Sequence, residues 1–238
     1  MDANHKKYSR LLKVSIFATG LSGIVAEYIL ATTATYFLGD SVFQWTIILS
    51  LMLFSMGLGS RFSKKIKKNL IESYIALELT LSIITSLSVV IIYALMPFIS
   101  SLDILLYGLS MFVGFLIGME IPLVTRINSE YEALNSNISG MMENDYYGSL
   151  IGGLFFAFIG IKYLGLTYTP FVVGGINLVV ALILIFQFRA LIKKQLFNKI
   201  RIASIAVVVI YSSGIFLSSP IVQYGNQSRF NEKVVFFI

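Results

Sequence analysis

Long apolar segments that carry almost no charge follow one another along most of this chain. A helix needs about 20 predominantly apolar residues to cross a bilayer. Hydropathy places seven such segments in the sequence, at residues 14–38, 42–60, 71–97, 102–125, 147–166, 169–188 and 201–219. Their apolar residues run continuously and do not alternate with polar ones, which favours helices over the strands of a barrel. The sequence therefore predicts an all-α integral membrane protein with seven transmembrane helices.

The composition supports this prediction and excludes several kinds of site. Hydrophobic residues make up 57% of the 238 residues and charged residues 13%, whereas soluble domains average about 45–50% and about 25%. The chain has no cysteine, and its single histidine, His5, lies in the polar N-terminal tail. Disulfides, thiolate nucleophiles and clusters of imidazole or thiolate ligands are thereby excluded. We expect no metal site and no cofactor.

The predicted spans alternate with short turns and longer polar connections. Turn residues lie at 39–41, 100–103 and 167–170, and the polar connections are 61–69, 127–146 and 189–199. The first span is too long for a signal peptide and contains Glu27, so we interpret it as a retained helix. We expect a membrane domain over residues 1–219, followed by a short extramembrane tail over 220–238.

Basic residues predict the orientation of the chain. Most of its 18 lysines and arginines lie in the N-terminal tail and in the second, fourth and sixth connections. Because basic loops remain on the cytoplasmic side, we expect a multi-pass protein of the cell (inner) membrane with a cytoplasmic N-terminus and an outer C-terminal tail. The net charge of +6 is then a topology signal and a contact with membrane lipid, so nucleic acid is not an expected partner.

Three carboxyl groups fall within the predicted spans, at Glu27, Glu78 and Glu120. Ionisable groups inside a bilayer are costly and often mark a functional site. No lysine or arginine lies well inside a span except Lys162, near the end of the fifth. Acids without basic partners are protonated, bonded to polar groups, or available to a cation. We predict that the three acids, together with Asp145 at the membrane boundary, bind a cation such as a polyamine.

A structural role for the same acids remains open. Each glutamate could accept a hydrogen bond from a neighbouring hydroxyl group and hold helices together. The hydroxyl groups we consider for this role are those of Thr32, Thr33, Ser82 and Tyr107.

Glycines at four-residue spacing predict close helix packing. Gly114 and Gly118 form one pair, and Gly148 and Gly152 form another. Small residues at this spacing let two helix backbones approach each other. We favour packing within the chain, with a homo-oligomer interface as the alternative. Pro122, four residues after Gly118, frees a carbonyl group in the same helix.

Four stretches resemble the membrane part of membrane-bound polyamine aminopropyltransferases, which are spermidine-synthase-like fusion proteins. They are SGIVAEYILATTATYFLGDSVF, MGLGSRFSKKIKK, GMEIPLVTRI and DYYGSLIGGLFFAF. The third is close to a G-x-E-x-P-x-x-x-R pattern of that family. The resemblance implies that the membrane part precedes a soluble catalytic domain that uses decarboxylated S-adenosylmethionine. Residues 221–238 resemble the first strand of that domain, with direct matches at Ser228 and Val235.

Two hypotheses for function follow. The first is a membrane domain that lacks the catalytic domain and binds or transports a polyamine or another small cation. The alternative is a membrane anchor or scaffold for a soluble aminopropyltransferase-like partner. The resemblance carries no catalytic residue into this chain, and the spans contain no nucleophile paired with a base. We therefore do not expect this chain by itself to be an enzyme.

Overall fold

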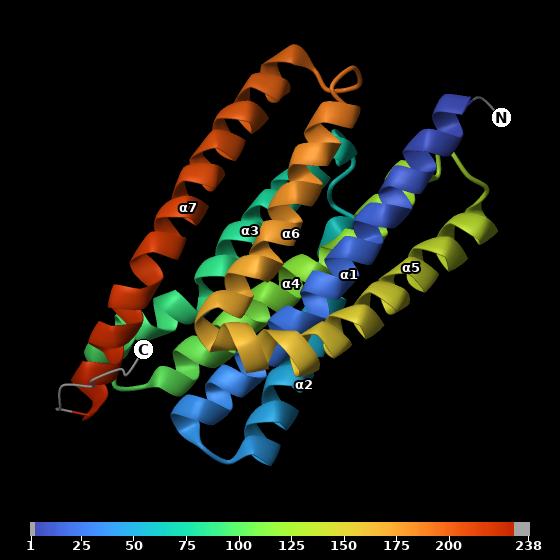
Figure 1. Ribbon diagram of the computed structural model, residues 1–238. Coiled ribbons are helices and arrows are strands. Elements are labelled where there is room, and N and C mark those ends of the chain that lie inside the picture. The colour runs from blue at the N-terminus through green and yellow to red at the C-terminus, as the bar shows by residue number, and fades with distance from the viewer. Residues whose placement is uncertain (1–2, 231–238) are drawn as a thin grey trace.

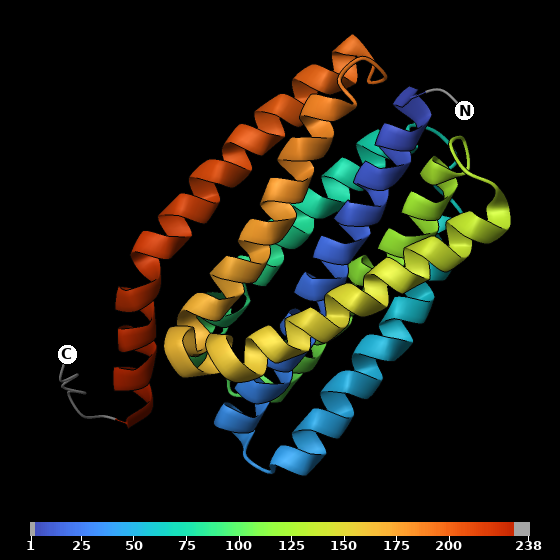
Figure 2. The same cartoon turned by 45° about the vertical axis from the view of Figure 1, so that its right-hand side comes forward.

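The computed structural model describes residues 3–230, and this part of the chain is helical with no β-strand. The elements are α1 (Ala3–Leu38), α2 (Ser41–Ser63), α3 (Leu70–Leu95), η1 (Met96–Phe98), α4 (Leu102–Asn128), α5 (Leu134–Phe155), η2 (Phe156–Leu164), α6 (Gly165–Gln187) and α7 (Lys194–Phe230). They form one elongated bundle, with the start of α1 and the end of α7 at opposite ends (Figure 1, Figure 2). The main apolar core lies between α1, α3, α4 and α6.

Glycines set the closest helix approaches in this bundle. A Cβ atom at Gly118 of α4 would collide with the backbone of Met56 in α2, and one at Gly148 of α5 would collide with the backbone of Phe17 in α1. A Cβ atom at Gly114 would lie 2.8 Å from a carbonyl oxygen of α2, and one at Gly152 would lie 2.5 Å from a carbonyl oxygen of α1. The two glycine pairs therefore join α4 to α2 and α5 to α1 within the chain.

The seven predicted spans fall in six continuous helical stretches. Each of the six is long and apolar enough to cross a membrane, judged by length and composition. The expected turn at 167–170 is helical instead, so that α5, η2 and α6 follow one another in a stretch of 54 residues, Leu134–Gln187. The chain nevertheless bends at Gly165, where φ is +64°, and α6 runs back in a different direction from α5 (Figure 1, Figure 2). The hydroxyl group of Thr169 donates to the carbonyls of Gly160 and Gly165 at 3.0 and 2.6 Å, and the first of these bonds spans the bend. The count of seven separate spans is therefore not supported.

The expected C-terminal β-strand is wrong where the structure describes the tail. Residues 220–230 continue α7 as helix. Ile221 and Val222 pack against an apolar cluster that includes Tyr93. Gly225 also packs closely there, since a Cβ atom at that position would lie 2.8 Å from the Tyr93 carbonyl oxygen. Burial against α3 thus favours helix over strand for this segment. Residues 231–238, and with them Val235, lie outside the described part of the chain.

Arg126, near the end of α4, forms hydrogen bonds with the connection between α2 and α3. Its guanidinium donates to the carbonyls of Ser63 and Ile66 at 2.7 and 2.8 Å, and its Nε donates to the Pro122 carbonyl at 3.1 Å. Helix C-termini leave carbonyl groups without partners inside the helix, and this side chain satisfies one at the end of α2. From the sequence, Arg126 was interpreted as a topology signal and as the arginine of the G-x-E-x-P-x-x-x-R pattern, without a structural role.

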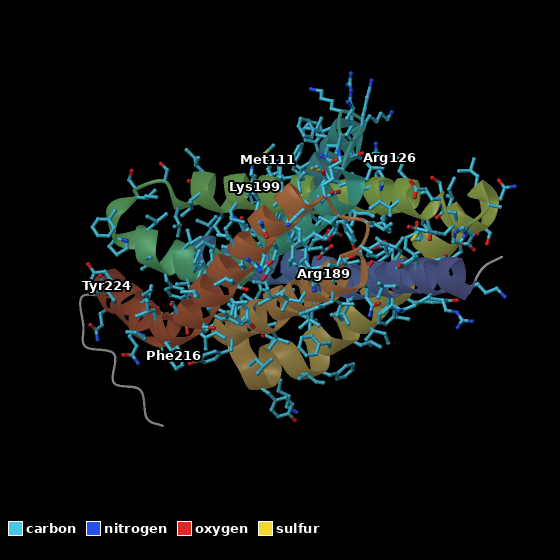
Figure 3. The ribbon with its side chains drawn as sticks, turned by 90° about the horizontal axis from the view of Figure 1, so that it is seen from above. Met111, Arg126, Arg189, Lys199, Phe216 and Tyr224 are labelled. Carbon is cyan, nitrogen blue, oxygen red and sulfur yellow. The ribbon has the colours of Figure 1, made fainter. Side chains whose placement is uncertain are left out.

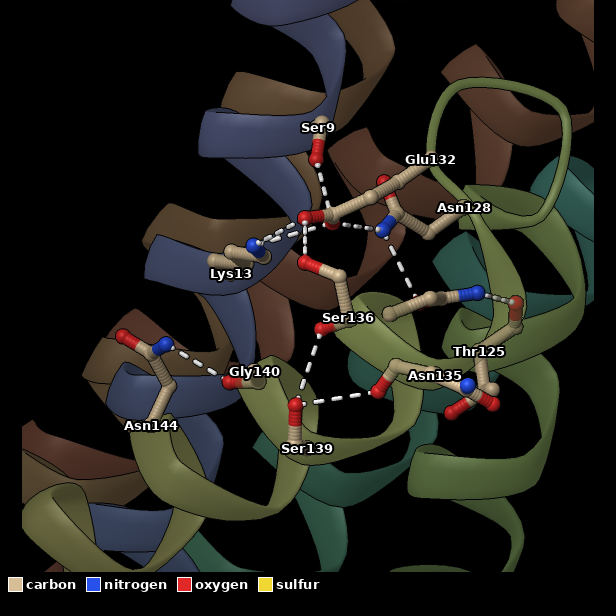
Figure 4. Close-up of polar contacts among 11 residues, drawn as sticks. Ser9, Lys13, Thr125, Asn128, Glu132, Asn135, Ser136, Ser139, Gly140 and Asn144 are labelled. Carbon is tan, nitrogen blue, oxygen red and sulfur yellow. Dashed lines mark hydrogen bonds and ion pairs between the residues drawn. The ribbon is translucent and has the colours of Figure 1, made fainter.

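The polar connection predicted at 127–146 is much shorter than expected, because α5 begins at Leu134. Glu132, in the turn between α4 and α5, forms an ion pair with Lys13 of α1 at 2.9 Å. It also accepts hydrogen bonds from Ser9, Asn128 and Ser136 (Figure 4). Residues 127–146 contain four acidic residues and no lysine. The fold supplies one from a residue more than a hundred positions earlier.

The surroundings of Glu132 lower its pKa. Desolvation raises the pKa of this carboxyl group, but the hydrogen bonds from Ser136, Lys13 and Asn128 and the charge of Lys13 outweigh it, and the pKa falls from 4.5 to about 2. A group with a lowered folded-state pKa stabilises the fold above its unfolded pKa and loses that contribution as the pH falls. The contribution of Glu132 is therefore present above about pH 4.5 and is lost as the pH falls towards 2.

We expect Glu132→Gln to lower the free energy of unfolding by about 1 kcal/mol at pH 7, because the variant loses the ion pair and keeps weaker hydrogen bonds. The difference from wild type should shrink as the pH is lowered from 7 towards 3. Thermal unfolding of the detergent-solubilised protein across this range measures it. Glu143→Gln, at an exposed position of α5, is the matched control and should behave as wild type. If the loss of stability in Glu132→Gln did not change with pH, the ion pair would not be the cause of that loss.

Candidate functional site

Four acidic side chains from four helices meet inside the bundle. Glu27 lies on α1, Glu78 on α3, Glu120 on α4 and Asp145 on α5. Glu27, Glu78 and Glu120 are 8%, 0% and 3% exposed, and Asp145 is partly buried. Burying a carboxyl group is costly unless other groups compensate it. A cluster of this kind therefore needs an explanation in terms of its neighbours.

The acids form a connected series. Glu78 and Glu120 interact directly with each other, and Asp145 lies close enough to act electrostatically on Glu120 and also on Glu27. The side chain of Asp145 packs against Gly20 of α1, where a Cβ atom would lie 2.7 Å from its Oδ1. Because the α1–α5 contact is so close, an acid expected at the boundary of the membrane reaches the interior of the bundle.

Hydroxyl groups extend the series at the Glu78 end. Tyr74, one turn before Glu78 on α3, interacts with that carboxyl group and donates a hydrogen bond to Ser15 of α1 at 3.2 Å. The hydroxyl group of Thr19, also on α1, interacts with Glu120. Sequence reasoning missed Tyr74, Ser15 and Thr19 as neighbours of the acids. The available signal was the four-residue spacing of Tyr74 and Glu78, which places both side chains on one face of a helix.

The hydroxyl groups suggested from the sequence as partners of the acids bond elsewhere. Thr32 and Thr33 donate to carbonyl groups of their own helix, and Tyr107 donates to Gln44 at 3.0 Å. The buried hydroxyl group of Ser82 has no hydrogen-bond partner within the described part of the chain. Both carboxyl oxygens of Glu78 likewise have no hydrogen-bond partner there. The hydroxyl groups near the acids are instead those of Thr19 and Tyr74.

No basic side chain of residues 3–230 forms an ion pair with the four acids. The ion pair found in that range joins Lys13 to Glu132. Lys162, the one base expected near a span, lies over the ring of Tyr163, with its Nζ 5.3 Å from the ring centroid. The same part of the chain contains no group of three or more histidine, cysteine or acidic residues arranged to hold a metal ion. The cluster thus presents carboxyl oxygens, which accept hydrogen bonds, without a protein cation beside them.

Comparison with known proteins shows what the chain as a whole is similar to. No protein-family model and no solved structure matches the chain. The chain is 40% identical over 230 residues to "Polyamine aminopropyltransferase 2" of Aquifex aeolicus, a match that covers 96% of this chain and 45% of that protein. It is a partial homologue of polyamine aminopropyltransferases. Proteins named polyamine aminopropyltransferase from Oceanobacillus iheyensis and Leptospira interrogans agree, at 31% and 30% identity over 96% and 94% of this chain.

These matches correct two expectations. A polyamine transporter was expected, but the relatives of this partial aminopropyltransferase homologue are named as enzymes, so that hypothesis is wrong. The chain was also expected to be a membrane domain that lacks the catalytic domain. The chain spans about half the length of the curated relatives it matches, 45% in each of the first three. That coverage makes it a partial homologue and does not support a membrane-domain-only protein.

Proposed function

We propose that this chain is part of a polyamine aminopropyltransferase and contributes a helical bundle to it. The observation that carries the proposal is the 40% identity to a protein of that name over 96% of this chain. The extent of the match matters, because it includes every helix that holds the acid cluster. The activity in question is the transfer of an aminopropyl group to a polyamine, as the name of the relatives states.

We further propose that the bundle is embedded in the cell membrane. Its six long apolar stretches support this, as do the large apolar side chains on its outer surface. Phe216 on α7 is 82% exposed, for example, and lies on the outside of the bundle (Figure 3). In water such a surface would promote association, whereas in a bilayer it meets lipid. The excess of basic residues in the N-terminal tail and the α2–α3 connection supports a cytoplasmic location for the N-terminus.

Within that enzyme, Glu27, Glu78, Glu120 and Asp145 are proposed as substrate-binding residues. Carboxyl oxygens accept charge-assisted hydrogen bonds from ammonium groups. The relatives are named after polyamines, which are molecules that carry several amino groups. The absence of an ion pair between these acids and a basic side chain of residues 3–230 supports the assignment. The acids would then serve the substrate of an enzyme and not a transport path.

The test is whether aminopropyl-transfer activity copurifies with the protein that contains this chain. The protein that contains it is tagged in its native host, extracted from membranes in mild detergent, purified and supplied with a diamine and decarboxylated S-adenosylmethionine. We expect activity in the purified fraction, and we expect the protein to remain in the membrane pellet after alkaline washing. Activity that stays in the unbound fraction would contradict the enzymatic assignment. Release of the protein by the alkaline wash would contradict the membrane assignment.

The same assay tests the acids. Glu120→Gln is expected to raise the KM for the amine substrate by about tenfold or more, since a hydrogen bond to a charged group contributes about 1.5–3 kcal/mol. Glu143→Gln, an exposed acid of α5, is the control and should leave the KM unchanged. An unchanged KM in Glu120→Gln would remove the substrate-binding role.

A further inference from the structure

An apolar groove of about 490 Å³ runs between α1 and α6. The two helices lie side by side in both views of the ribbon (Figure 1, Figure 2). Aliphatic side chains line most of the groove, among them Leu11, Val14 and Ala18 of α1 and Val172, Val179 and Ile183 of α6. The lining from Val172 to Ile183 follows the helix for roughly 17 Å at the rise of an α-helix. The groove is therefore elongated and runs parallel to the helices.

The few polar atoms in the lining already have partners. The Ser15 hydroxyl donates to the Leu12 carbonyl at 2.7 Å and accepts from Tyr74 at 3.2 Å. The Tyr211 hydroxyl donates to the Phe171 carbonyl at 2.8 Å. A ligand in the groove thus meets hydrocarbon and no hydroxyl group in need of a partner. This chemistry fits an aliphatic chain and disfavours a polar molecule.

Positive charge borders one end of the groove. Lys7 and Arg10 are exposed and lie one turn before Leu11 and Val14 on the same faces of α1. Stacking of Tyr8 on Phe188 brings this end of α1 against the end of α6, which Arg189 follows directly (Figure 3). Helix α6 contains no charged residue, and the single acid of α1, Glu27, lies towards its opposite end. The rim of the groove is therefore basic at the end formed by the start of α1 and the end of α6.

We propose that this groove binds one acyl chain of an anionic phospholipid, whose phosphate group contacts Lys7, Arg10 and Arg189. The apolar lining accommodates the acyl chain, and the basic rim selects the charge of the headgroup. The inference rests on the proposed membrane location but not on the enzymatic one. It assigns a specific lipid site to a face of the bundle outside the acid cluster.

Lipid binding by the detergent-purified protein tests the proposal. The probes are phosphatidylglycerol and phosphatidylcholine with identical acyl chains, and the readouts are lipid retained in native mass spectrometry and the shift in Tm. Wild type is expected to prefer phosphatidylglycerol by about 150-fold, which is the combined effect expected of three basic residues near an anionic headgroup. Val179→Trp fills the groove and should abolish retention of both lipids. Leu53→Trp, at an exposed apolar position of α2, is the matched control and should retain them.

Two double variants distinguish the contribution of the lipid headgroup from that of the acyl chain. Lys7→Glu with Arg10→Glu should remove the preference and leave weak binding of both lipids, whereas Lys64→Glu with Lys65→Glu makes the same charge change in another loop and should preserve the preference. Equal retention of both lipids by wild type, or equal retention by Val179→Trp and Leu53→Trp, would overturn the proposal. Either result would leave the membrane assignment standing, because alkaline extraction tests that assignment separately.

Discussion

Replacing Gly118 with leucine is expected to unfold most of the protein at temperatures where wild type is stable. Any side chain at this position must enter the backbone of Met56, so α4 and α2 have to separate along a contact that also includes Gly114. Overpacking in a core typically costs 1–3 kcal/mol, and more where backbone cannot move. We expect a loss of about 4 kcal/mol, measured as the Tm and the yield of monodisperse protein in detergent.

Gly108→Leu is the matched control for this variant. Gly108 lies on the same helix, but a Cβ atom there would have no heavy atom within 4 Å. Leucine has the higher helix propensity, so this variant should be as stable as wild type or slightly more stable. Equal stability of the two variants would show that the close approach of α2 and α4 does not occur.

Replacing Arg126 with alanine is expected to lower the free energy of unfolding by about 2–3 kcal/mol. The change removes three hydrogen bonds from one cation and leaves the carbonyls of Ser63 and Ile66 without the partner that joins them to α4. Arg126→Lys should recover only part of the loss, because an ammonium group cannot reproduce the fork of two guanidinium donors. Thermal unfolding in detergent measures the stability of wild type, Arg126→Ala and Arg126→Lys.

Arg61→Ala provides the comparison at the same end of α2, where Arg61 is exposed. It should change the Tm little, since the loss of one surface charge in a basic segment has a small effect. If Arg126→Ala and Arg61→Ala behaved alike, the stabilising role of Arg126 would be refuted and only its charge would matter.

The sequence predicted the local features of this fold well because they depend on local composition. Hydropathy located each apolar helix, and the glycine spacing at Gly114–Gly118 and Gly148–Gly152 marked faces that pack closely in the structure. The boundaries that failed depend on contacts between distant segments. Packing of Ile221, Val222 and Gly225 around Tyr93 of α3 keeps the end of the described chain helical, and no hydropathy window registers that.

The candidate site was predictable as a set of residues but not as an arrangement. Uncompensated acids in apolar segments identified Glu27, Glu78 and Glu120. That Asp145 joins them depends on the close packing of α5 against α1 at Gly20, which is a tertiary contact. The pairing of Lys13 with Glu132 depends on contact between α1 and the turn that joins α4 to α5. Neither follows from the sequence positions of the residues, because the partners are more than a hundred residues apart.

The polyamine content of the native host, measured after the gene that encodes this chain is inactivated, tests the enzymatic assignment. If the chain is part of a polyamine aminopropyltransferase, the aminopropylated polyamine should fall and its precursor should accumulate. The wild-type gene should restore both, and so should a copy with Gly108→Leu, whereas a copy with Gly118→Leu should not. An unchanged polyamine profile in the inactivated strain, with no second enzyme induced, would show that the chain is not part of a polyamine aminopropyltransferase.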